Sequence, residues 1–462
     1  MSLTMPPARI VAESNSPLLA AADSWTRRPL GEVAEILNGF AFKSEQFSTD
    51  GGKPLIRIRD LFTESTAVAY AGEYDERYLV EPGELLVGMD GDFNASRWRG
   101  PQALLNQRVC KIIPTADQLD IDFLTYLIPG YLQAIHDVTS STTVTHLSSR
   151  DVAQIPIPVP PLAEQRQLAQ LFRLAHAKQE SSAAHLQAAQ RATERFRRAI
   201  LAAACSGRLT SGWREKHNVA ESAQALVARS RAALAPRRAT EEWSAPDWLE
   251  IPRSWQWAPL RDLAAIRSGI QKQPSRTPKK NRYPYLRVAN VLRGRLDLSE
   301  IHEFELFDGE LDVYRLEPGD LLVVEGNGSP SEIGRAALWR GEIPDCIHQN
   351  HIIRVRCIAL EPSFLELFWN SPIGSREVAA LAVTTAGLYS LSSGKIAAVT
   401  VPVPPLNEQR EIAARATALL ATASGLSSRL EKTRSYVERT FQAVLAKGFR
   451  GELNGVADEV GA

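Results

Sequence analysis

Short apolar runs alternate with polar, turn-forming segments over two parts of the chain. The β-rich runs are 54–58, 85–87 and 109–113 in the first part, and 285–288, 321–324 and 351–356 in the second. Gly, Pro, Asn and Asp punctuate these runs, as they do between strands in general. Helical patterns at 122–134 and 363–370 lie among them. Both parts are therefore predicted to be mixed α/β domains.

Two longer stretches carry apolar residues at helical spacing. Pro161 and Pro405 mark their starts, because proline loses no needed N–H in the first turn of a helix. Glu164 and Glu408 follow close to the positive end of the helix dipole. The first helix, from residue 162 to about 204, would be roughly 65 Å long at 1.5 Å per residue.

In the second of these helices the apolar residues are spaced 7, 4, 7, 4 and 3 apart, which is typical of a coiled-coil seam. Neither helix can bury such a stripe alone. Each is expected to pair with the other in an antiparallel coiled coil, with one α/β domain at either end. The residues predicted to line the seam are Leu168, Leu171, Leu186, Phe196, Ile200, Leu419, Leu426, Leu430, Val437 and Phe441.

The whole pattern occurs twice. Ile-Pro-Val-Pro-Pro-Leu-Ala-Glu-Gln-Arg at 157–166 recurs as Val-Pro-Val-Pro-Pro-Leu-Asn-Glu-Gln-Arg at 401–410, an offset of 244 residues. Nearer the N-terminus the offset is 230 for Pro54 and Pro284, and 236 for Glu81 and Glu317. Offsets that grow in steps are expected for two copies of one fold whose loops differ in length. We therefore predict an internal pseudo-two-fold repeat of two tandem α/β domains separated by long helices.

These patterns predict the domain boundaries. The α/β domains are placed at 25–155 and 251–400, and the long helical segments at 156–210 and 401–455. A linker with a short helix is expected between the copies, over 211–250, and tails at 1–24 and 456–462.

Net charge alone argues against a nucleic-acid ligand, because 53 Lys and Arg residues balance 53 Asp and Glu residues. The distribution of charge argues the other way. Residues 267–295 carry nine basic side chains and no acid, and residues 93–116 carry four and no acid. Basic stretches of this kind suit phosphate contacts. The alternative is a solvated face whose acids come from elsewhere in the fold.

The sequence offers no sign of a catalytic centre. The four cysteines are scattered, and His348 and His351 lack a third ligand nearby, so no metal site is expected. Ser393-Gly394-Lys395 lacks the first glycine of a phosphate-binding loop. Neither an adenine-methyltransferase motif nor a Gly-rich cofactor loop is found. With no signal peptide or membrane-length apolar run, a cytoplasmic protein without a cofactor of its own is predicted.

Together these motifs resemble one family. The doubled Pro-Leu-x-Glu-Gln-Arg helix starts, Gly-Phe-Ala-Phe-Lys-Ser at 39–44, and the repeated Glu-Pro-Gly-Glu/Asp-Leu-Leu are similar to the specificity (S) subunits of Type I restriction–modification systems. The similarity runs from about Trp25 to Gly455.

The resemblance implies a non-catalytic subunit whose two α/β domains are target-recognition domains, each reading one half of a bipartite, asymmetric DNA site. The helices would act as a spacer and dock two methyltransferase (M) subunits. Two motor-nuclease (R) subunits would complete the complex. S-adenosylmethionine, ATP and Mg would then belong to those partners, for adenine methylation or ATP-dependent cleavage.

Candidate DNA-binding residues follow from side-chain chemistry. Lys and Arg anchor phosphates, while Arg, Gln, Asn and His can hydrogen-bond base edges. In the first domain the candidates are Lys43, Arg97, Arg99, Gln107, Arg108, Thr143, His146 and Arg150. In the second they are Lys272, Arg276, Lys279, Lys280, Arg282, Arg293, Asn327, Arg335, Gln349, Asn350 and Tyr389.

Gln107 and Gln349 precede strands at places that look equivalent, which suggests a shared DNA-facing edge. The alternative is that both side chains bind the backbone of their own domain. Arg57 and Arg287 occur in both copies inside predicted strands, so a structural role is expected for them.

Two other functions remain open. A coiled-coil scaffold that binds only proteins would show no sequence-dependent DNA binding, whereas specific DNA binding should weaken steeply as salt rises. A methyltransferase in its own right would bind S-adenosylmethionine as the isolated chain.

Overall fold

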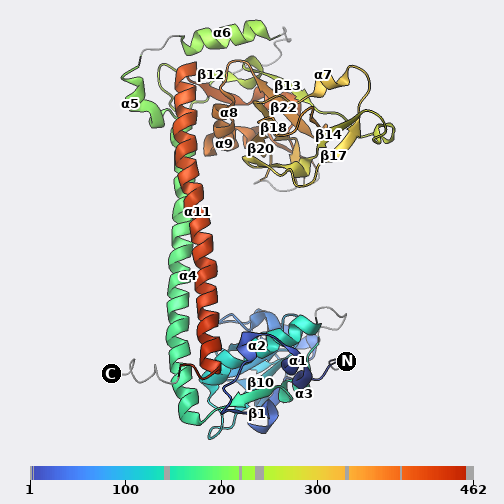
Figure 1. The fold of residues 1–462 in the computed structure, drawn as a ribbon, viewed down its shortest axis with the longest axis vertical. Coiled ribbons are helices and arrows are strands. Elements are labelled where there is room, and N and C mark those ends of the chain that lie inside the picture. The colour runs from blue at the N-terminus through green and yellow to red at the C-terminus, as the bar shows by residue number, and fades with distance from the viewer. Residues whose placement is uncertain are drawn as a thin grey trace. The chain divides into compact units, whose positions relative to one another are not determined.

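The computed structural model describes residues 3, 5–139, 146–217, 221–234, 244–327, 332–385 and 388–453 (Figure 1). It divides into two compact units. The first unit is Met1–Gln187 with Glu431–Ala462, and the second is Ala188–Leu430. Each unit therefore holds one α/β domain together with part of each of the two long helices.

The first unit is built on a four-stranded antiparallel sheet in the order β2-β10-β7-β8. Helix α2 contacts β8, and the largest apolar core of the unit lies on this side of the sheet. The bounds are β2 (Ala34–Asn38), β7 (Leu85–Gly88), β8 (Ala95–Arg97), β10 (Val109–Pro114), α2 (Ile121–Thr139) and α3 (Ser149–Ala153).

A second sheet of the first unit has the order β3-β5-β4-β9-β6, and β1 pairs with β11 beside the start of the first long helix. The bounds are β1 (Thr26–Pro29), β3 (Phe47–Ser48), β4 (Lys53–Ile56), β5 (Ala69–Tyr70), β6 (Leu79–Val80), β9 (Ala103–Leu105) and β11 (Pro156–Val159).

The N-terminal segment is part of the first domain. Helix α1 (Pro7–Glu13) contacts α2, and Ile10 and Leu19 are only 2% and 4% exposed. The prediction of a tail over residues 1–24 is therefore wrong. Its short apolar residues pack into the main core, and a seven-residue helix is too short to show a clear periodic pattern in the sequence.

The second unit has a four-stranded antiparallel sheet in the order β13-β22-β18-β20, with α8 against β18 and β20. The bounds are β13 (Ala264–Ser268), β18 (Asp320–Val324), β20 (Ala336–Leu338), β22 (Ile352–Cys357), α8 (Pro362–Trp369) and α9 (Pro372–Leu381).

Smaller sheets complete the second unit, in the orders β12-β25, β17-β14-β21, β15-β16 and β19-β24-β23. Their bounds are β12 (Gln256–Pro259), β14 (Arg282–Leu286), β15 (Val291–Leu292), β16 (Arg295–Leu296), β17 (His302–Glu305), β19 (Gly326–Asn327), β21 (Ile347–His348), β23 (Val383–Thr385), β24 (Leu388–Ser390) and β25 (Thr400–Val403). Short helices are α5 (Ser211–Arg214), α6 (Ala223–Ala233), α7 (Glu310–Tyr314) and α10 (Ser393–Ala398).

The main strands and helices predicted for both domains are confirmed. Two predicted strands end early, however, because β4 stops at Ile56 and β14 at Leu286. The next residue, Arg57 or Arg287, begins a 3₁₀ turn in which its N–H donates to the side chain of Asp60 or Asn290, at 3.0 and 2.8 Å. The Arg57 side chain lies 3.8 Å from Asp60 and that of Arg287 lies 3.1 Å from Glu300, which favours the structural role expected for these two arginines.

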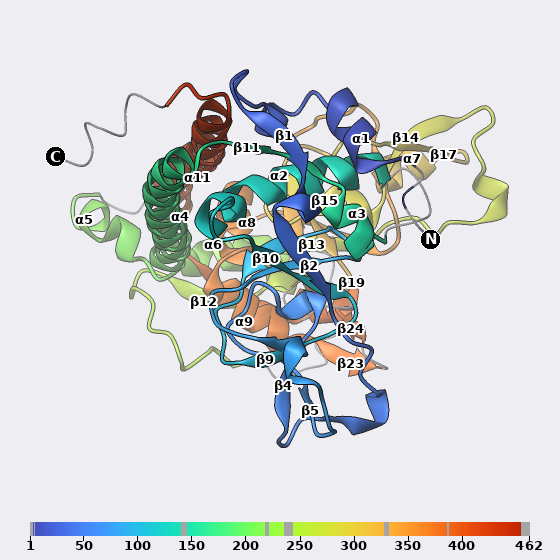
Figure 2. The ribbon, with the colours of Figure 1, turned by 90° about the horizontal axis from the view of Figure 1, so that it is seen from below.

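The long helices are α4 (Leu162–Cys205) and α11 (Leu406–Phe449), and within each unit their segments lie side by side (Figures 1 and 2). In the first unit the Phe172 ring lies 5.2 Å from that of Phe449, and His176 lies 5.4 Å from Phe441. In the second unit Arg197 donates to Ser424 at 2.8 Å, and Arg415 donates at 3.4 Å to the carbonyl of Leu209, in the 3₁₀ turn just after α4 ends. Within each unit, low numbers on α4 meet high numbers on α11, so the segments run antiparallel.

The predicted seam is correct at most positions. Leu168 and Ile200 are buried, and Leu171, Leu186, Leu419, Leu430, Val437 and Phe441 are half-buried. Phe196 and Leu426 are 42% and 43% exposed, so the seam prediction is wrong there. The inward stripe of α4 passes through Thr193, Arg197 and Ile200, one position away from Phe196. Leu426 lies at the border of a stripe that one partner helix cannot fully cover.

Candidate nucleic-acid interface

The doubled Pro-Leu-x-Glu-Gln-Arg motif ties the start of each long helix to its own domain. Glu164 accepts a hydrogen bond from the Trp25 indole at 3.2 Å, and Glu408 accepts one from the Trp255 indole at 2.9 Å. Glu408 is fully buried and also contacts the guanidinium of Arg214. The two carboxylates therefore anchor the chain entering each domain to a helix start.

The glutamine of the motif holds the backbone on both sides of it. Gln165 donates to the carbonyls of Gln118 and Pro160 and accepts from the Asp120 N–H, at 2.7–2.8 Å. Gln409 donates to the carbonyls of Ala359 and Pro404 and accepts from the Glu361 N–H. Both side chains are fully buried. The Glu and Gln of the motif thus form a repeated structural clamp, while its arginines, Arg166 and Arg410, stay exposed.

Each main sheet buries one cation at equivalent places. Lys111 lies 3.0 Å from Glu84 and donates to the Leu79 carbonyl, while Arg354 donates to the Arg315 carbonyl at 2.9 Å. Burial lowers the pKa of Arg354. Lys111 is 6% exposed, so it cannot contribute to a basic surface over residues 93–116.

The clearest equivalence between the domains lies just before β10 and β22. Asn106 pairs with Phe40 in a parallel bridge, and Gln349 pairs with Ile270 in the same way. The N–H groups of the next residues, Gln107 and Asn350, donate to the carbonyls of Phe40 and Ile270, both at 2.9 Å. Gln107 therefore corresponds to Asn350, and the predicted pairing of Gln107 with Gln349 is wrong by one residue.

The matching backbone hydrogen bonds of the two domains continue for one more residue. The carbonyl of Arg108 accepts from the Met89 N–H at 3.0 Å, and the carbonyl of His351 accepts from the Glu325 N–H at 2.9 Å. We call Asn106-Gln107-Arg108 and Gln349-Asn350-His351 the strand-entrance segments. Four of these residues were predicted to bind DNA, and the structure brings them to equivalent places in the two domains.

Acidic side chains flank both strand-entrance segments. Asp90 lies 3.3 Å from Arg108 and also contacts the His146 ring. Glu325 lies 2.8 Å from the His351 ring. Sequence reasoning missed Asp90, Glu325 and His351 as candidates. A carboxylate one or two residues beyond the strands β7 and β18 was the available signal.

The Gln349 side chain hydrogen-bonds the backbone of its own domain, because its carbonyl oxygen accepts from the Val288 N–H at 3.4 Å. It also lines a cavity of about 310 Å³ with Lys272, Arg287 and Tyr285. Burial raises the pKa of Tyr285 to about 12, so its hydroxyl stays protonated at neutral pH. The cavity wall is therefore polar next to the second strand-entrance segment.

Three arginines predicted to bind DNA form hydrogen bonds or ion pairs within their own domains. Arg97 contacts Asp122 and donates to the Gly83 carbonyl at 2.6 Å. Arg276 makes two hydrogen bonds of 2.8 Å to Glu310, and the bond to this carboxylate raises the arginine pKa. Arg335 donates to the Val291 carbonyl at 2.7 Å. These contacts favour structural roles for all three.

Most of the predicted cations stay at the surface. Exposed side chains include those of Lys43, Arg99, Gln107, Arg150, Lys272, Lys279 and Lys280. The N–H groups of Lys279 and Lys280 donate to the Glu305 carboxylate, and hydrogen bonds from this turn, chiefly from Asn281, lower the Glu305 pKa. The turn is therefore fixed while its two lysine side chains remain exposed. Arg282 is also exposed, 3.7 Å from Glu303.

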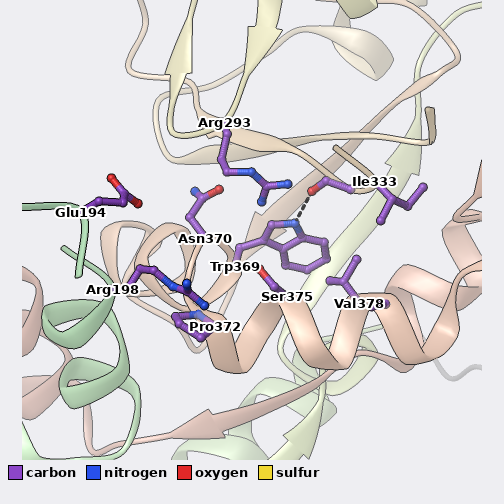
Figure 3. A pocket seen from close by; sticks show the side chains of 11 residues that line it. Glu194, Arg198, Arg293, Ile333, Trp369, Asn370, Pro372, Ser375 and Val378 are labelled. Atoms are coloured by element: carbon purple, nitrogen blue, oxygen red, sulfur yellow. Dashed lines mark hydrogen bonds between the residues drawn. The ribbon is translucent and has the colours of Figure 1, made fainter. Parts of the chain in front are cut away.

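Arg293 lies next to a cavity that also contacts the first long helix. With Arg198 of α4 it lines a cavity of about 660 Å³ beside Trp369 and Asn370 (Figure 3). The Trp369 indole donates to the Gly334 carbonyl at 2.7 Å and closes one wall. Arg293 thus faces a cavity that it shares with the long helix α4.

Comparison with known proteins shows which family the chain belongs to. Residues 22–179 match the family model described as the Type I restriction modification DNA specificity domain. The chain is 34% identical over 470 aligned residues to the Type I restriction enzyme EcoBI specificity subunit of Escherichia coli, covering 98% of this chain and 91% of that protein. The chain belongs to the family of Type I restriction enzyme specificity subunits.

Other members of the specificity-subunit family agree. The EcoKI specificity subunit of Escherichia coli strain K12 is 24% identical, over 93% of this chain and 89% of that protein. A solved structure titled for complex assembly and conformational transition of the type I R-M system superposes with a TM-score of 0.64 at 17% identity, over 94% of this chain and 99% of that one. This likeness supports the α/β fold with long helices.

Some candidate residues of this specificity subunit fall outside the described parts. Thr143 does so entirely. Asn327 and Tyr389 pair through their backbones in β19 and β24, but their side chains are outside the described set.

Among the described residues, no group of three His, Cys, Asp or Glu side chains could hold a metal ion. His348 is fully buried, and burial lowers its pKa to about 4. Its ring hydrogen-bonds the Ile352 carbonyl at 2.9 Å, so it stays neutral and structural. Burial raises the pKa of Cys110, Cys205, Cys346 and Cys357 to about 12, which makes these thiols poor nucleophiles. No helix in the described ranges has the length and apolarity to cross a membrane.

Proposed function

We propose that this chain is a non-catalytic DNA sequence-specificity subunit that reads the two halves of a bipartite, asymmetric site. One observation carries the proposal. The two domains hold their strand-entrance segments in the same backbone hydrogen-bond frame but present different polar side chains there. Two copies of one fold with different reading chemistry suit a site whose halves differ in sequence. Membership of the specificity-subunit family supports the same conclusion.

We further infer that the two units are copies of one repeat and that α4 and α11 form an antiparallel coiled coil. The repeated Trp–Glu and Gln–backbone contacts support the first inference. The antiparallel contacts found within each unit support the second. Such a pair of helices would act as the spacer between the two half-sites.

The partners follow from this function. Two methyltransferase subunits would supply S-adenosylmethionine chemistry for adenine methylation, and two motor-nuclease subunits would use ATP and Mg for cleavage. The chain itself would act in the cytoplasm with double-stranded DNA. Because its net charge is zero, most non-specific DNA affinity would come from the partners.

Modified-base sequencing tests the proposal. Host DNA is compared with and without this chain, in both cases with the methyltransferase subunit of its own system present. Adenine methylation at one gapped, asymmetric motif is expected only when the chain is present. An unchanged methylation map with intact complex assembly would favour a protein-binding scaffold. S-adenosylmethionine binding by the isolated chain would instead favour an enzyme.

A further inference from the structure

Buried residues hold both ends of each strand-entrance segment. Leu105 and Val109 flank the first segment, and both are fully buried. His348 and Ile352 flank the second, and they are fully buried as well. Between these anchors the same main-chain hydrogen bonds recur in both domains. Because these hydrogen bonds fix the backbone before DNA binds, the side chains on it lose less conformational entropy on binding.

The side chains at these equivalent positions differ in length at the first two and in functional group at the third. Asn106 stands where the second domain has Gln349, Gln107 where it has Asn350, and Arg108 where it has His351. All six side chains can hydrogen-bond base edges. The clamp residues at the helix starts, by contrast, are the same in both domains, as Trp25 with Trp255 and Gln165 with Gln409 show.

The acids beside these segments distinguish base reading from phosphate anchoring. The Asp90 carboxylate forms an ion pair with Arg108, and the Glu325 carboxylate contacts the His351 ring. A carboxylate next to a phosphate contact would repel the backbone of DNA, so it weakens an anchoring role. Next to a base edge it can orient the donor of its neighbour or accept from the amino group of cytosine.

We propose that the strand-entrance segments are the base-reading elements, one for each half-site. Arg108 and His351 would donate to the acceptors of guanine, and Gln107 and Asn350 would bind adenine, as amide side chains do in the major groove. Asp90 and Glu325 are positioning residues for Arg108 and His351. This inference rests on the proposed function and deepens it.

The test uses the full chain assembled with the methyltransferase subunit of its system, and the methylated motif is mapped by modified-base sequencing. Arg108→Ala is expected to lower discrimination at one base pair of one half-site by about tenfold to a hundredfold. His351→Ala should do the same in the other half-site. Asp90→Asn should relax the base pair that Arg108→Ala relaxes, and no other.

Matched controls remove exposed arginines that lie elsewhere on each unit. Arg9 pairs with Glu13 on α1 and is 67% exposed, and Arg229 pairs with Glu221 and is 59% exposed. Arg9→Ala and Arg229→Ala should leave both half-sites unchanged.

A variant that exchanges residues between the domains avoids truncated side chains, which could disturb folding. Asn106→Gln, Gln107→Asn and Arg108→His together install the residues that the second domain already carries in this frame. The first half-site should change and the second should stay. If the unmodified complex yields a gapped motif and no variant alters either half, the inference is wrong and the proposed function stands. If the unmodified complex yields no motif, both are overturned.

Discussion

Gln165 and Gln409 show how much one side chain can stabilise when all its polar groups are used. Each is fully buried and bonded to three backbone groups. Gln165→Ala or Gln409→Ala leaves those groups unpaired, so we expect a loss of about 2–4 kcal/mol in the free energy of unfolding. Urea denaturation measures it. Gln167→Ala, an exposed change on the same helix, should stay within about 0.5 kcal/mol.

His348 makes stability depend on pH in a predictable direction. Its pKa falls from about 6.5 when exposed to about 4 in the fold, because burial disfavours the charged ring. The unfolded chain therefore binds the extra proton between pH 6.5 and 4, and about 3 kcal/mol of stability is lost as pH falls through this window.

His348→Leu tests this, because Leu105 occupies the equivalent place in the first domain. Denaturation of both proteins at pH 7 and pH 4.5 should show a smaller loss for the variant. Equal losses would mean that other groups account for the pH dependence.

Individual residue roles were only partly predictable from sequence. The motif containing Gln165 marks a helix start, but its buried bonds reach Gln118 and Asp120, more than forty residues away. Arg97 and Arg276 were predicted to bind DNA because their acidic partners, Asp122 and Glu310, lie 25 and 34 residues further along the chain. The one-residue error in pairing Gln107 arose because backbone register is set by hydrogen bonds, which spacing alone does not show.

At the scale of elements, the long helices show which seam residues matter. Ile200 is 4% exposed within the core of the second unit, whereas Phe196 is 42% exposed. Ile200→Ala should cost about 2–4 kcal/mol in the free energy of unfolding, because it opens a cavity. Phe196→Ala should cost less than about 1 kcal/mol despite removing the larger side chain. Equal costs would contradict the assigned stripe.

The sequence predicted elements well wherever a pattern was long or repeated. The two 44-residue helices and the main-sheet strands were located closely. Helix α1 was missed because its seven residues carry too little periodicity, and its stability comes from packing on α2. The ends of β4 and β14 were missed because the side chains of Asp60 and Asn290 cap a turn there. The pattern of hydrophobic residues carries no signal for such a cap.

At the scale of the whole molecule, charge balance limits how this chain can bind DNA. Within the basic stretch 267–295, Arg276 pairs with Glu310 and Arg287 with Glu300. Acids from elsewhere in the fold thus neutralise part of it, as the alternative interpretation of that stretch expected. Lys272, Lys279 and Lys280 remain exposed. The isolated chain is therefore expected to bind its own duplex weakly at physiological salt.

Salt dependence tests whether the exposed lysines anchor phosphates. Each phosphate contact contributes about −0.9 to the slope of log K against log salt concentration. Lys272→Ala, Lys279→Ala and Lys280→Ala together should make the slope of the methyltransferase complex shallower by about 2–3, while the methylated motif stays the same. Arg229→Ala, an exposed change on α6, should alter neither quantity. A changed motif would assign these lysines to base reading, because the loss of a phosphate anchor weakens binding equally at every sequence. An unchanged slope would remove them from the DNA interface.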